Sequence, residues 1–419
     1  PMTVPNPFAS AYFRSATGWL GGKVVVFGLL GLLNQALLTR NLPRADYGLL
    51  VWLGTIIALL SPVGFPGVST SITGAVAKGF DGNFRKGSIQ EMLGGVLGGI
   101  ILLGFAWYQW AVVGSRTGAL VFVAAAVVGP GLWLDTHLCY WNGKQDFRAI
   151  FWWSVVTRTL QVAATYGAFF ISRNIVLVAA VQVGLQALGN LVAVGALLYS
   201  PQVGRRYSPE YSRYGFFSSW LYLAGTLSAQ LDKLIIGTFL GLESLALFAV
   251  GELLYQYIYK IPGGILQQML SPRLAQMSVR DAAVWMRKRQ WMLFIGLTAA
   301  CGIAAIALPY VYPFVFSTKY NDSIRYAYLF LVCIVCGAPG LGVESLFRTH
   351  AMQHETGKSW AILSLTPLVL VPLFGWLWGP VGIIIARCVT NASASVYYAY
   401  ALSYIAKNEI TQRTPDAHA

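Results

Sequence analysis

Charged and polar side chains recur at helical spacing inside the longest apolar runs of this sequence. Because residues three or four positions apart share one face of a helix, each of these runs predicts a polar stripe on an apolar helix. One stripe contains Ser154, Arg158, Gln161 and Thr165; a second contains Thr226, Gln230, Lys233 and Gly237; a third contains Arg387, Asn391, Ser395 and Tyr398. Guanidinium and ammonium groups on such faces suit an anionic ligand, and phosphate is the obvious chemical class.

Two further apolar runs carry polar residues on one face. Lys23 and Asn34 lie eleven residues apart, and Glu252 begins a stripe with Gln256, Tyr259 and Gly263. A charge at the centre of a membrane-spanning helix costs roughly 2.5–3.5 kcal/mol, so such residues are expected to face a hydrated cavity or a partner. We therefore predict a mostly cationic cavity. Its predicted substrate-binding residues are Lys23, Asn34, Arg158, Gln161, Gln230, Lys233, Arg387 and Asn391.

Acidic residues in the same runs have two interpretations. Asp232 lies one step round the helix from Lys233, so we expect it to brace a neighbouring helix. An ion pair between helices explains Asp232 and Lys260 at least as well as a cavity does. Glu252 and Glu344 are candidates for coupling to Na+ or H+, because intramembrane carboxylates relay protons, and packing pairs explain them equally well.

Motifs for metal or nucleotide chemistry are weak or missing. His350 and His354 have the i, i+4 spacing of metal ligands and Glu355 follows them, but no clear third ligand is present. We therefore predict no metal site and no cofactor. The sequence contains no G-x-x-x-x-G-K phosphate loop, which argues against a nucleotide-driven pump.

The composition defines the environment of these residues. The chain has 419 residues, of which 56% are hydrophobic and 11% charged, whereas soluble domains carry about 25% charged residues. Apolar runs of about 20 residues recur, each long enough to cross a bilayer as a helix. We predict an all-α polytopic membrane protein in which the spans that contain Pro62 and Pro66, and Pro262, are tilted or kinked. The twelve predicted spans are 17–39, 46–76, 88–113, 118–141, 149–171, 174–199, 214–240, 244–271, 291–315, 324–348, 359–378 and 380–405.

The connections predict the orientation and the division of the chain. Most Lys and Arg residues between spans fall on the side of the two termini, which predicts that both termini are cytoplasmic. The net charge of +14 then reflects this bias and attraction to anionic lipids, not nucleic-acid binding. The longest polar connection divides the spans six and six. The predicted parts are an N-terminal lobe (1–200), a cytoplasmic linker (201–213), a C-terminal lobe (214–405) and a polar tail (406–419).

Two segments resemble signatures of a known transporter family. "GLLNQALLTRNLPRADYGLL" (31–50) is similar to the first-to-second span signature of polysaccharide flippases, and "LDKLIIGTFLGLESLALFAVGELL" (231–254) resembles their seventh-to-eighth span signature. The twelve-span layout fits as well. The chain thus resembles the Wzx-like branch of the multidrug/oligosaccharidyl-lipid/polysaccharide (MOP) exporter superfamily.

This resemblance implies a function. Such a protein would flip a polyprenyl-pyrophosphate-linked oligosaccharide, such as an O-antigen or exopolysaccharide repeat unit, across a bacterial plasma (inner) membrane. It would work by alternating access, coupled to Na+ or H+, in contact with membrane lipids and other polysaccharide-assembly proteins. Lys23, Arg158, Lys233 and Arg387 would then meet the pyrophosphate.

Two other functions remain open. A multidrug exporter of the same fold is the nearest alternative, but such pumps tend to place a carboxylate in the first span, where this chain has Lys23. A membrane polysaccharide polymerase or ligase is a more distant one, because those enzymes commonly carry a long external loop and the external connections here are short. We therefore expect a secondary transporter and not an enzyme.

Overall fold

The computed structural model describes residues 11–201, 203–260, 277–350 and 352–407, together with positions 263, 266, 270 and 274. Within these residues every regular element is a helix. The chain divides into two compact units, Pro1–Gln230 and Leu231–Ala419. This division falls inside a helix, and the predicted linker at 201–213 stays a prediction.

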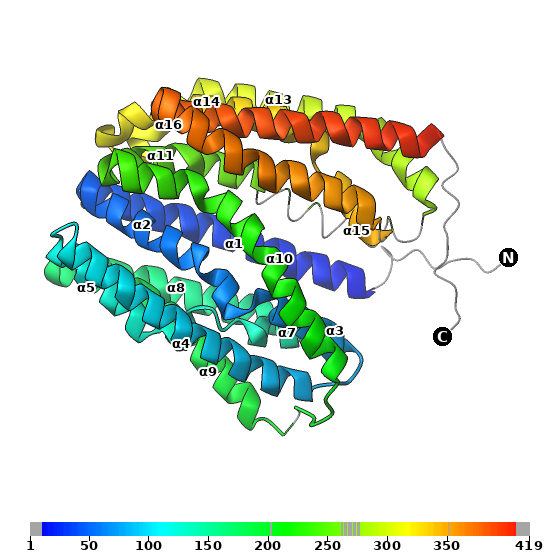
Figure 1. The fold of residues 1–419 in the computed structure, drawn as a ribbon, viewed down its shortest axis with the longest axis horizontal. Coiled ribbons are helices and arrows are strands. Elements are labelled where there is room, and N and C mark those ends of the chain that lie inside the picture. The colour runs from blue at the N-terminus through cyan, green and yellow to red at the C-terminus, as the bar shows by residue number, and fades with distance from the viewer. Residues whose placement is uncertain are drawn as a thin grey trace. The chain divides into compact units, whose positions relative to one another are not determined.

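Unit 1 is a bundle of long helices joined by short turns. Within it, α4 packs against α5, and α8 packs against both α1 and α9; Figure 1 shows α4 and α5 side by side. The elements are α1 (Ala11–Asn41), α2 (Arg44–Leu59), a 3-10 turn (Ser61–Gly64), α3 (Pro66–Ala77), α4 (Gly82–Ala111), α5 (Arg116–Val127), α6 (Gly129–Leu132), α7 (Thr136–Gly143), α8 (Phe147–Ser172), α9 (Ile175–Tyr199) and most of α10 (Pro209–Ile235).

Two spans of unit 1 are broken. The predicted kink at Pro62 and Pro66 is confirmed, because the helices on either side bend by 46° and Phe65 between them takes a left-handed φ of 56°. The span formed by α5, α6 and α7 bends by 68°. Trp133 joins the two breaks, since its indole Nε1 donates to the Ile57 carbonyl at 3.1 Å. One carbonyl group next to the first break is therefore satisfied by a side chain from the second.

Small residues let the broken spans approach α4 closely. A Cβ atom at Gly98 would lie 2.3 Å from the Trp133 ring, and one at Gly95 would lie 2.5 Å from the Gly129 carbonyl oxygen. Such distances leave no room for any side chain. The Gly94-x-x-x-Gly98 pattern thus marks a close packing face.

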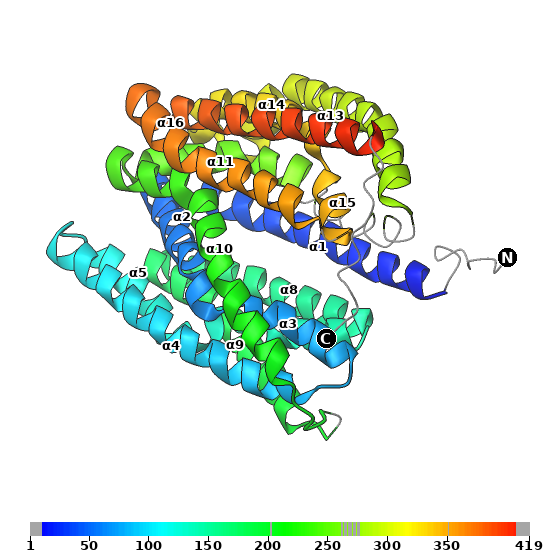
Figure 2. The ribbon, with the colours of Figure 1, turned by 45° about the vertical axis from the view of Figure 1, so that its right-hand side comes forward.

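Unit 2 is also a bundle of long helices, and some of these are interrupted by π-helical segments or a kink. In it, α14 packs against α11 and α16, and Figure 2 shows α14 and α16 side by side. A non-helical Gly379 (φ 59°) kinks α16, which thus contains two of the predicted spans. The elements are the end of α10, a π-helical segment (Ile236–Leu240), α11 (Leu242–Tyr255), a second π segment (Gln256–Lys260), α13 (Val279–Phe316), 3-10 turns (Thr318–Ser323 and Ala338–Gly340), α14 (Ile324–Gly337), α15 (Val343–Thr349) and α16 (Gln353–Lys407).

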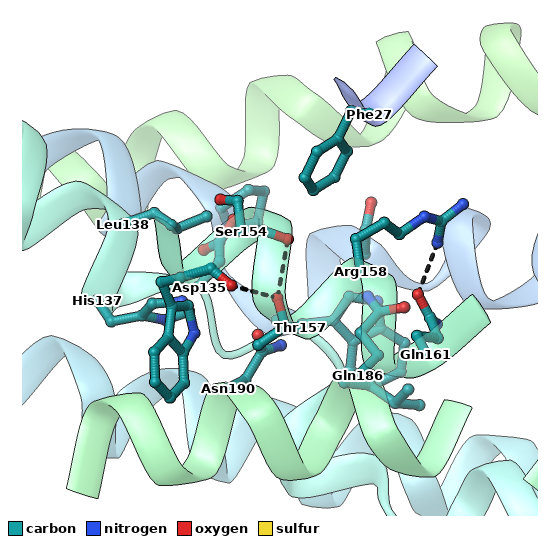
Figure 3. A pocket seen from close by; sticks show the side chains of 16 residues that line it. Phe27, Asp135, His137, Leu138, Ser154, Thr157, Arg158, Gln161, Gln186 and Asn190 are labelled. Carbon is teal, nitrogen blue, oxygen red and sulfur yellow. Dashed lines mark hydrogen bonds between the residues drawn. The ribbon is translucent and has the colours of Figure 1, made fainter. Parts of the chain in front are cut away.

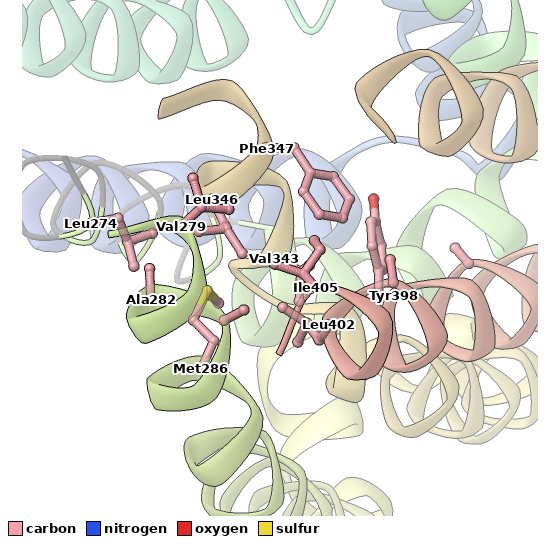
Figure 4. Close-up of a cluster of buried hydrophobic side chains, with 13 residues drawn as sticks. Leu274, Val279, Ala282, Met286, Val343, Leu346, Phe347, Tyr398, Leu402 and Ile405 are labelled. Atoms are coloured by element: carbon pink, nitrogen blue, oxygen red, sulfur yellow. The ribbon is translucent and has the colours of Figure 1, made fainter. Parts of the chain in front are cut away.

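A buried apolar cluster ties together three elements of unit 2. It joins the start of α13, the short α15 and the last turns of α16 (Figure 4). Phe347 is fully buried there, and its ring lies 5.9 Å from that of Tyr398. The cluster fixes one end of α16 and therefore the rotation of its polar stripe. Pro262, at which a kink was predicted, lies outside the described residues.

The helices are apolar on their outer surfaces. Leu29 is 64% exposed and Ile306 is 76% exposed, although both lie in the middle of long helices. Such surfaces need lipid and not water around them. Within the described residues, six helices are long and apolar enough to cross a membrane, or eight if each bent pair is one span. The predicted all-α polytopic membrane fold is thus confirmed, whereas the side on which the termini lie stays a prediction.

Candidate functional site

A polar cavity of 440 Å³ lies inside unit 1 and is called here the N cavity. The break in the second span forms one wall and the polar stripe of α8 forms another (Figure 3). Its lining residues are Phe27, Ser61, Gly64, Pro66, Leu132, Trp133, Asp135, His137, Leu138, Trp153, Ser154, Thr157, Arg158, Gln161, Gln186 and Asn190. The cavity therefore combines a guanidinium group, a carboxyl group and an imidazole with amides, hydroxyls and aromatic rings.

Hydrogen bonds fix the key side chains of the N cavity. Arg158 Nη1 donates to Gln161 Oε1 at 2.6 Å, and Gln161 Nε2 donates to the Gln182 carbonyl at 2.6 Å. This hydrogen bond positions the Arg158 guanidinium at the cavity wall. Across the cavity, Asn190 Nδ2 donates to the Gly131 carbonyl at 2.9 Å. The predicted stripe of α8 thus faces a cavity, as its spacing suggested.

Two carboxyl groups beside the N cavity were missed by the sequence interpretation. Glu91 and Asp135, called here the carboxyl pair, both contact the hydroxyl of Ser69. Both lie within predicted spans, so the criterion that selected Glu252 and Glu344 would have selected them as well. His137, buried and in the same cavity, was also not predicted.

Unit 2 contains a buried group of charges, called here the charge cluster: Asp232, Lys233, Glu252, Lys260 and Arg387. Glu252 is at its centre and is 0% exposed. Its carboxylate lies 2.8 Å from Lys233 Nζ, 3.2 Å from Arg387 Nη1 and 3.6 Å from Lys260 Nζ. Arg387 Nη2 also lies 2.6 Å from Asp232 Oδ2. Three cations thus surround two carboxylates, which leaves one positive charge in excess.

The charge cluster answers how Asp232 and Lys233 can stand side by side on α10. They point to different partners: Asp232 to Arg387 on α16 and Lys233 to Glu252 on α11. Asp232 thus forms an ion pair with a cation of another helix, which was one of its two predicted roles. Lys233 and Arg387, predicted to bind substrate, each already have a carboxylate partner.

A second cavity, of 290 Å³, adjoins the charge cluster and is called here the C cavity. Lys260 links the two, because its side chain is 46% exposed and its Nζ lies 5.4 Å from the Tyr255 ring. Two predicted residues, Asn391 and Glu344, line this cavity. The other lining residues are Tyr255, Tyr259, Gly263, Gly337, Gly340, Leu341, Gly342, Leu363, Ala394, Ser395 and Tyr398.

The remaining predicted residues lie elsewhere. Lys23 Nζ is 5.6 Å from the ring centroid of Phe27, which lines the N cavity. Asn34 is buried and Gln230 half-buried, and neither lines the N cavity or the C cavity. Among the described residues, no three His, Cys, Asp or Glu side chains gather as metal ligands. Glu355, beside the two histidines, accepts a hydrogen bond from Tyr397.

The class of the protein follows from its sequence and fold. The sequence matches the family described as "Polysaccharide biosynthesis protein" over residues 15–278, more than half of the chain. The protein belongs to this family, in agreement with the resemblance of the two quoted segments. No curated protein shows a significant match to the sequence.

Solved structures show the same fold over nearly the whole chain. An inward-facing MATE family multidrug transporter of the MOP superfamily matches with a TM-score of 0.69 and 16% identity, over 91% of this chain and 96% of that one. The eukaryotic MATE transporter AtDTX14 matches with a TM-score of 0.67 and 15% identity, over 95% and 96%. An outward-facing MATE structure matches with a TM-score of 0.60 and 16% identity, over 95% and 96%. Identities this low show that the fold is shared and nothing further about this chain.

Proposed function

We propose that this protein is a flippase for a polyprenyl-pyrophosphate-linked oligosaccharide in the bacterial plasma membrane. The observation that supports this proposal most directly is the N cavity, which holds a guanidinium group, amides, hydroxyls and indole rings within an apolar helix bundle. Membership of the polysaccharide biosynthesis family supports the same substrate class. Transport would proceed by alternating access, without a chemical step.

The residues of the N cavity match the two polar parts of such a substrate. Arg158 offers a planar donor group to a phosphate oxygen, and Gln161 holds it in place. Gln186, Asn190 and Thr157 offer amide and hydroxyl groups to sugar hydroxyls, while the Trp153 indole offers an apolar face to a sugar ring. At 440 Å³ the cavity is within the range of small-molecule sites, so it would hold a part of the glycan near its linkage.

The charge cluster would provide a second attraction for the anion. Its excess positive charge reaches the C cavity at Lys260, which is paired with Glu252 at 3.6 Å, and the carboxyl group of Glu344 lines the same cavity. Lys233 and Arg387 would act mainly through this excess, because a pyrophosphate would have to compete with Glu252 and Asp232 for them.

A multidrug exporter of the same fold is the second candidate, favoured by the MATE structures with similar folds. A cation exporter needs an acidic binding site. Asp135 lines the N cavity, but α1 contains Lys23 and no Asp or Glu. The excess charge of the cluster also disfavours an organic cation. A polysaccharide polymerase or ligase is a third and weaker candidate.

Transport in proteoliposomes tests the proposal. Labelled polyprenyl-pyrophosphate oligosaccharide is followed across the bilayer with the wild type, Arg158→Ala and Arg158→Lys. We expect Arg158→Ala to lower the rate at least tenfold and Arg158→Lys to recover part of it, since the charge remains and the planar donor geometry is lost.

Arg173→Ala is the matched control, because Arg173 ends the same helix, is exposed and lies outside the N cavity. It is expected to transport at the wild-type rate. If the wild type flips the substrate and Arg158→Ala is unimpaired, the N cavity is not the site. Export of a cationic dye without any flipping would assign the protein to multidrug transport.

A further inference from the structure

The carboxyl pair has no role in the proposed binding of an anion, yet its geometry is unusual. Ser69, in the first turns of α3, places its hydroxyl oxygen 2.7 Å from Asp135 Oδ1 and in hydrogen-bond contact with Glu91 Oε1. Glu91 comes from α4, and Asp135 immediately precedes α7. One hydroxyl group therefore joins two carboxyl groups from two other segments.

Two hydrogen bonds need two hydrogen atoms, and the Ser69 hydroxyl supplies only one of them. The second must be a proton on one of the two carboxyl groups. A serine hydroxyl has one hydrogen, so it can donate to only one of the two carboxyl groups. The other contact is a hydrogen bond only if that carboxyl group is protonated and donates to Ser69 Oγ. Two charged carboxylates this close would also repel each other, and such pairs share one proton.

No cationic side chain of the described residues neutralises the carboxyl pair in place of this proton. Within the described residues, neither Glu91 nor Asp135 forms an ion pair. Glu91 is 1% exposed, and its second oxygen, Oε2, is buried without a hydrogen-bond partner in the part of the chain described. An ionised carboxylate in this position would lack both solvent and a counter-ion, whereas a neutral acid needs neither.

The charged neighbours of the pair are few. The elements packed against α4 and α7 are α3, α5, α6, α8, α9 and the 3-10 turn. Of these, α3, α6, α9 and the 3-10 turn contain no Asp, Glu, Lys, Arg or His, α5 contains only Arg116 at its first residue, and α8 contributes Arg148 and Arg158. The titratable groups facing this part of unit 1 are Cys139 and His137 on α7 and Lys23 on α1.

We propose that Glu91, Ser69 and Asp135 form a binding site for one exchangeable proton that opens onto the N cavity through Asp135. Asp135 is exposed and lines that cavity, so it can exchange a proton with water there. The proton passes inward when protonated Asp135 donates to Ser69 Oγ while the Ser69 hydrogen moves to Glu91. Glu91 gains one proton, Asp135 loses one and Ser69 is unchanged.

The bound proton would link protonation to the broken spans. With the proton present, hydrogen bonds connect α3, α4 and the start of α7. Without it, two negative charges face each other across one hydroxyl and favour the separation of these segments. Because Asp135 lines the N cavity, proton loss would change the cavity itself. This site does not depend on which substrate the protein transports.

Infrared spectroscopy of the whole protein in nanodiscs tests the site without any transported substrate. The C=O stretching band of a protonated carboxyl group is followed from acidic to alkaline pH in H2O and D2O. The wild type is expected to keep one such band at neutral pH and lose it at alkaline pH. Glu91→Gln and Asp135→Asn each remove one of the two charges, so the band should disappear or titrate at a lower pH.

Asp146→Asn serves as the matched control, because Asp146 caps α8 by accepting from the Ala149 amide and asparagine caps equally well. Its spectra should match those of the wild type. An unchanged titration in both Glu91→Gln and Asp135→Asn, or no band at neutral pH in the wild type, would overturn the proposal. Loss of the band when choline chloride is replaced by sodium chloride at constant pH would overturn it too, because the occupant would then be Na+.

Discussion

Each unit of this protein holds two neighbouring acidic side chains inside its helix bundle, and the two pairs are compensated in opposite ways. In unit 2, Glu252 and Asp232 are surrounded by Lys233, Lys260 and Arg387 at 2.6–3.6 Å. In unit 1, Glu91 and Asp135 share one serine hydroxyl and, among the described residues, form no ion pair. A buried carboxylate is stable only when paired, and a carboxyl group that lacks a partner takes up a proton.

The difference indicates different tasks. The charge cluster holds α10, α11 and α16 together without a bound proton, because each of its carboxylates is paired with a cation. The carboxyl pair holds α3, α4 and the start of α7 together only while its proton is present. The first arrangement suits a fixed positive field for an anionic substrate, and the second suits an exchangeable proton.

The largest effect is expected from Glu252→Gln. This change leaves Lys233 and Arg387 buried with only Asp232 to compensate them, and breaking a buried pair costs about 3–5 kcal/mol. Lys260 contributes less, because its side chain is 46% exposed. Thermal unfolding in detergent measures the loss, and Glu243→Gln, an exposed residue in the first turn of the same helix, should change it little. A wild-type unfolding temperature for Glu252→Gln would contradict the central role of Glu252.

A smaller loss of unfolding free energy is expected when only the ion pair between Asp232 and Arg387 is removed. The single variants Asp232→Asn and Arg387→Gln and the double variant form a cycle in the free energy of unfolding. We expect a coupling of roughly 1–3 kcal/mol, since the two groups lie 2.6 Å apart and out of water. Additive effects of the two changes would show that Asp232 is held by another group.

The smallest effect is expected from Glu91→Gln, the same chemical change made in unit 1. Glutamine keeps an acceptor and a donor for Ser69 and removes no counter-ion, so the cost in unfolding free energy should stay below about 1 kcal/mol near neutral pH. The same thermal assay applies, with Glu252→Gln as the reference. If Glu91→Gln destabilises as strongly as Glu252→Gln, then Glu91 is ionised and paired, and the contrast between the units is lost.

The spacing of polar residues predicted a part of the candidate site. Ser154, Arg158 and Gln161 recur at steps of four and three residues, and the structure places all three on the N cavity. Periodicity succeeds here because a helix turns by a fixed angle per residue, so a stripe in the sequence becomes a face in space. For the same reason Asn391 and Ser395 both line the C cavity.

Contacts between helices could not be predicted in this way. The sequence placed Lys233 and Arg387 on a cavity face but could not show that Glu252 and Asp232 lie 2.8 Å and 2.6 Å from them. It gave no reason to connect Ser69 with Glu91 and Asp135, which are 22 and 66 positions away. A pattern along one helix contains no information on which face of another helix it meets.

The sequence by itself determined the class of this protein. Its apolar runs, its low content of charged residues and two quoted segments led to an all-α membrane protein of the polysaccharide biosynthesis family, because the composition of a helix shows whether lipid or water surrounds it. The tertiary structure decided which buried charges are neutralised by a partner and which by a proton. That outcome depends on distances of about 3 Å between helices far apart in the chain, and only packing sets those distances.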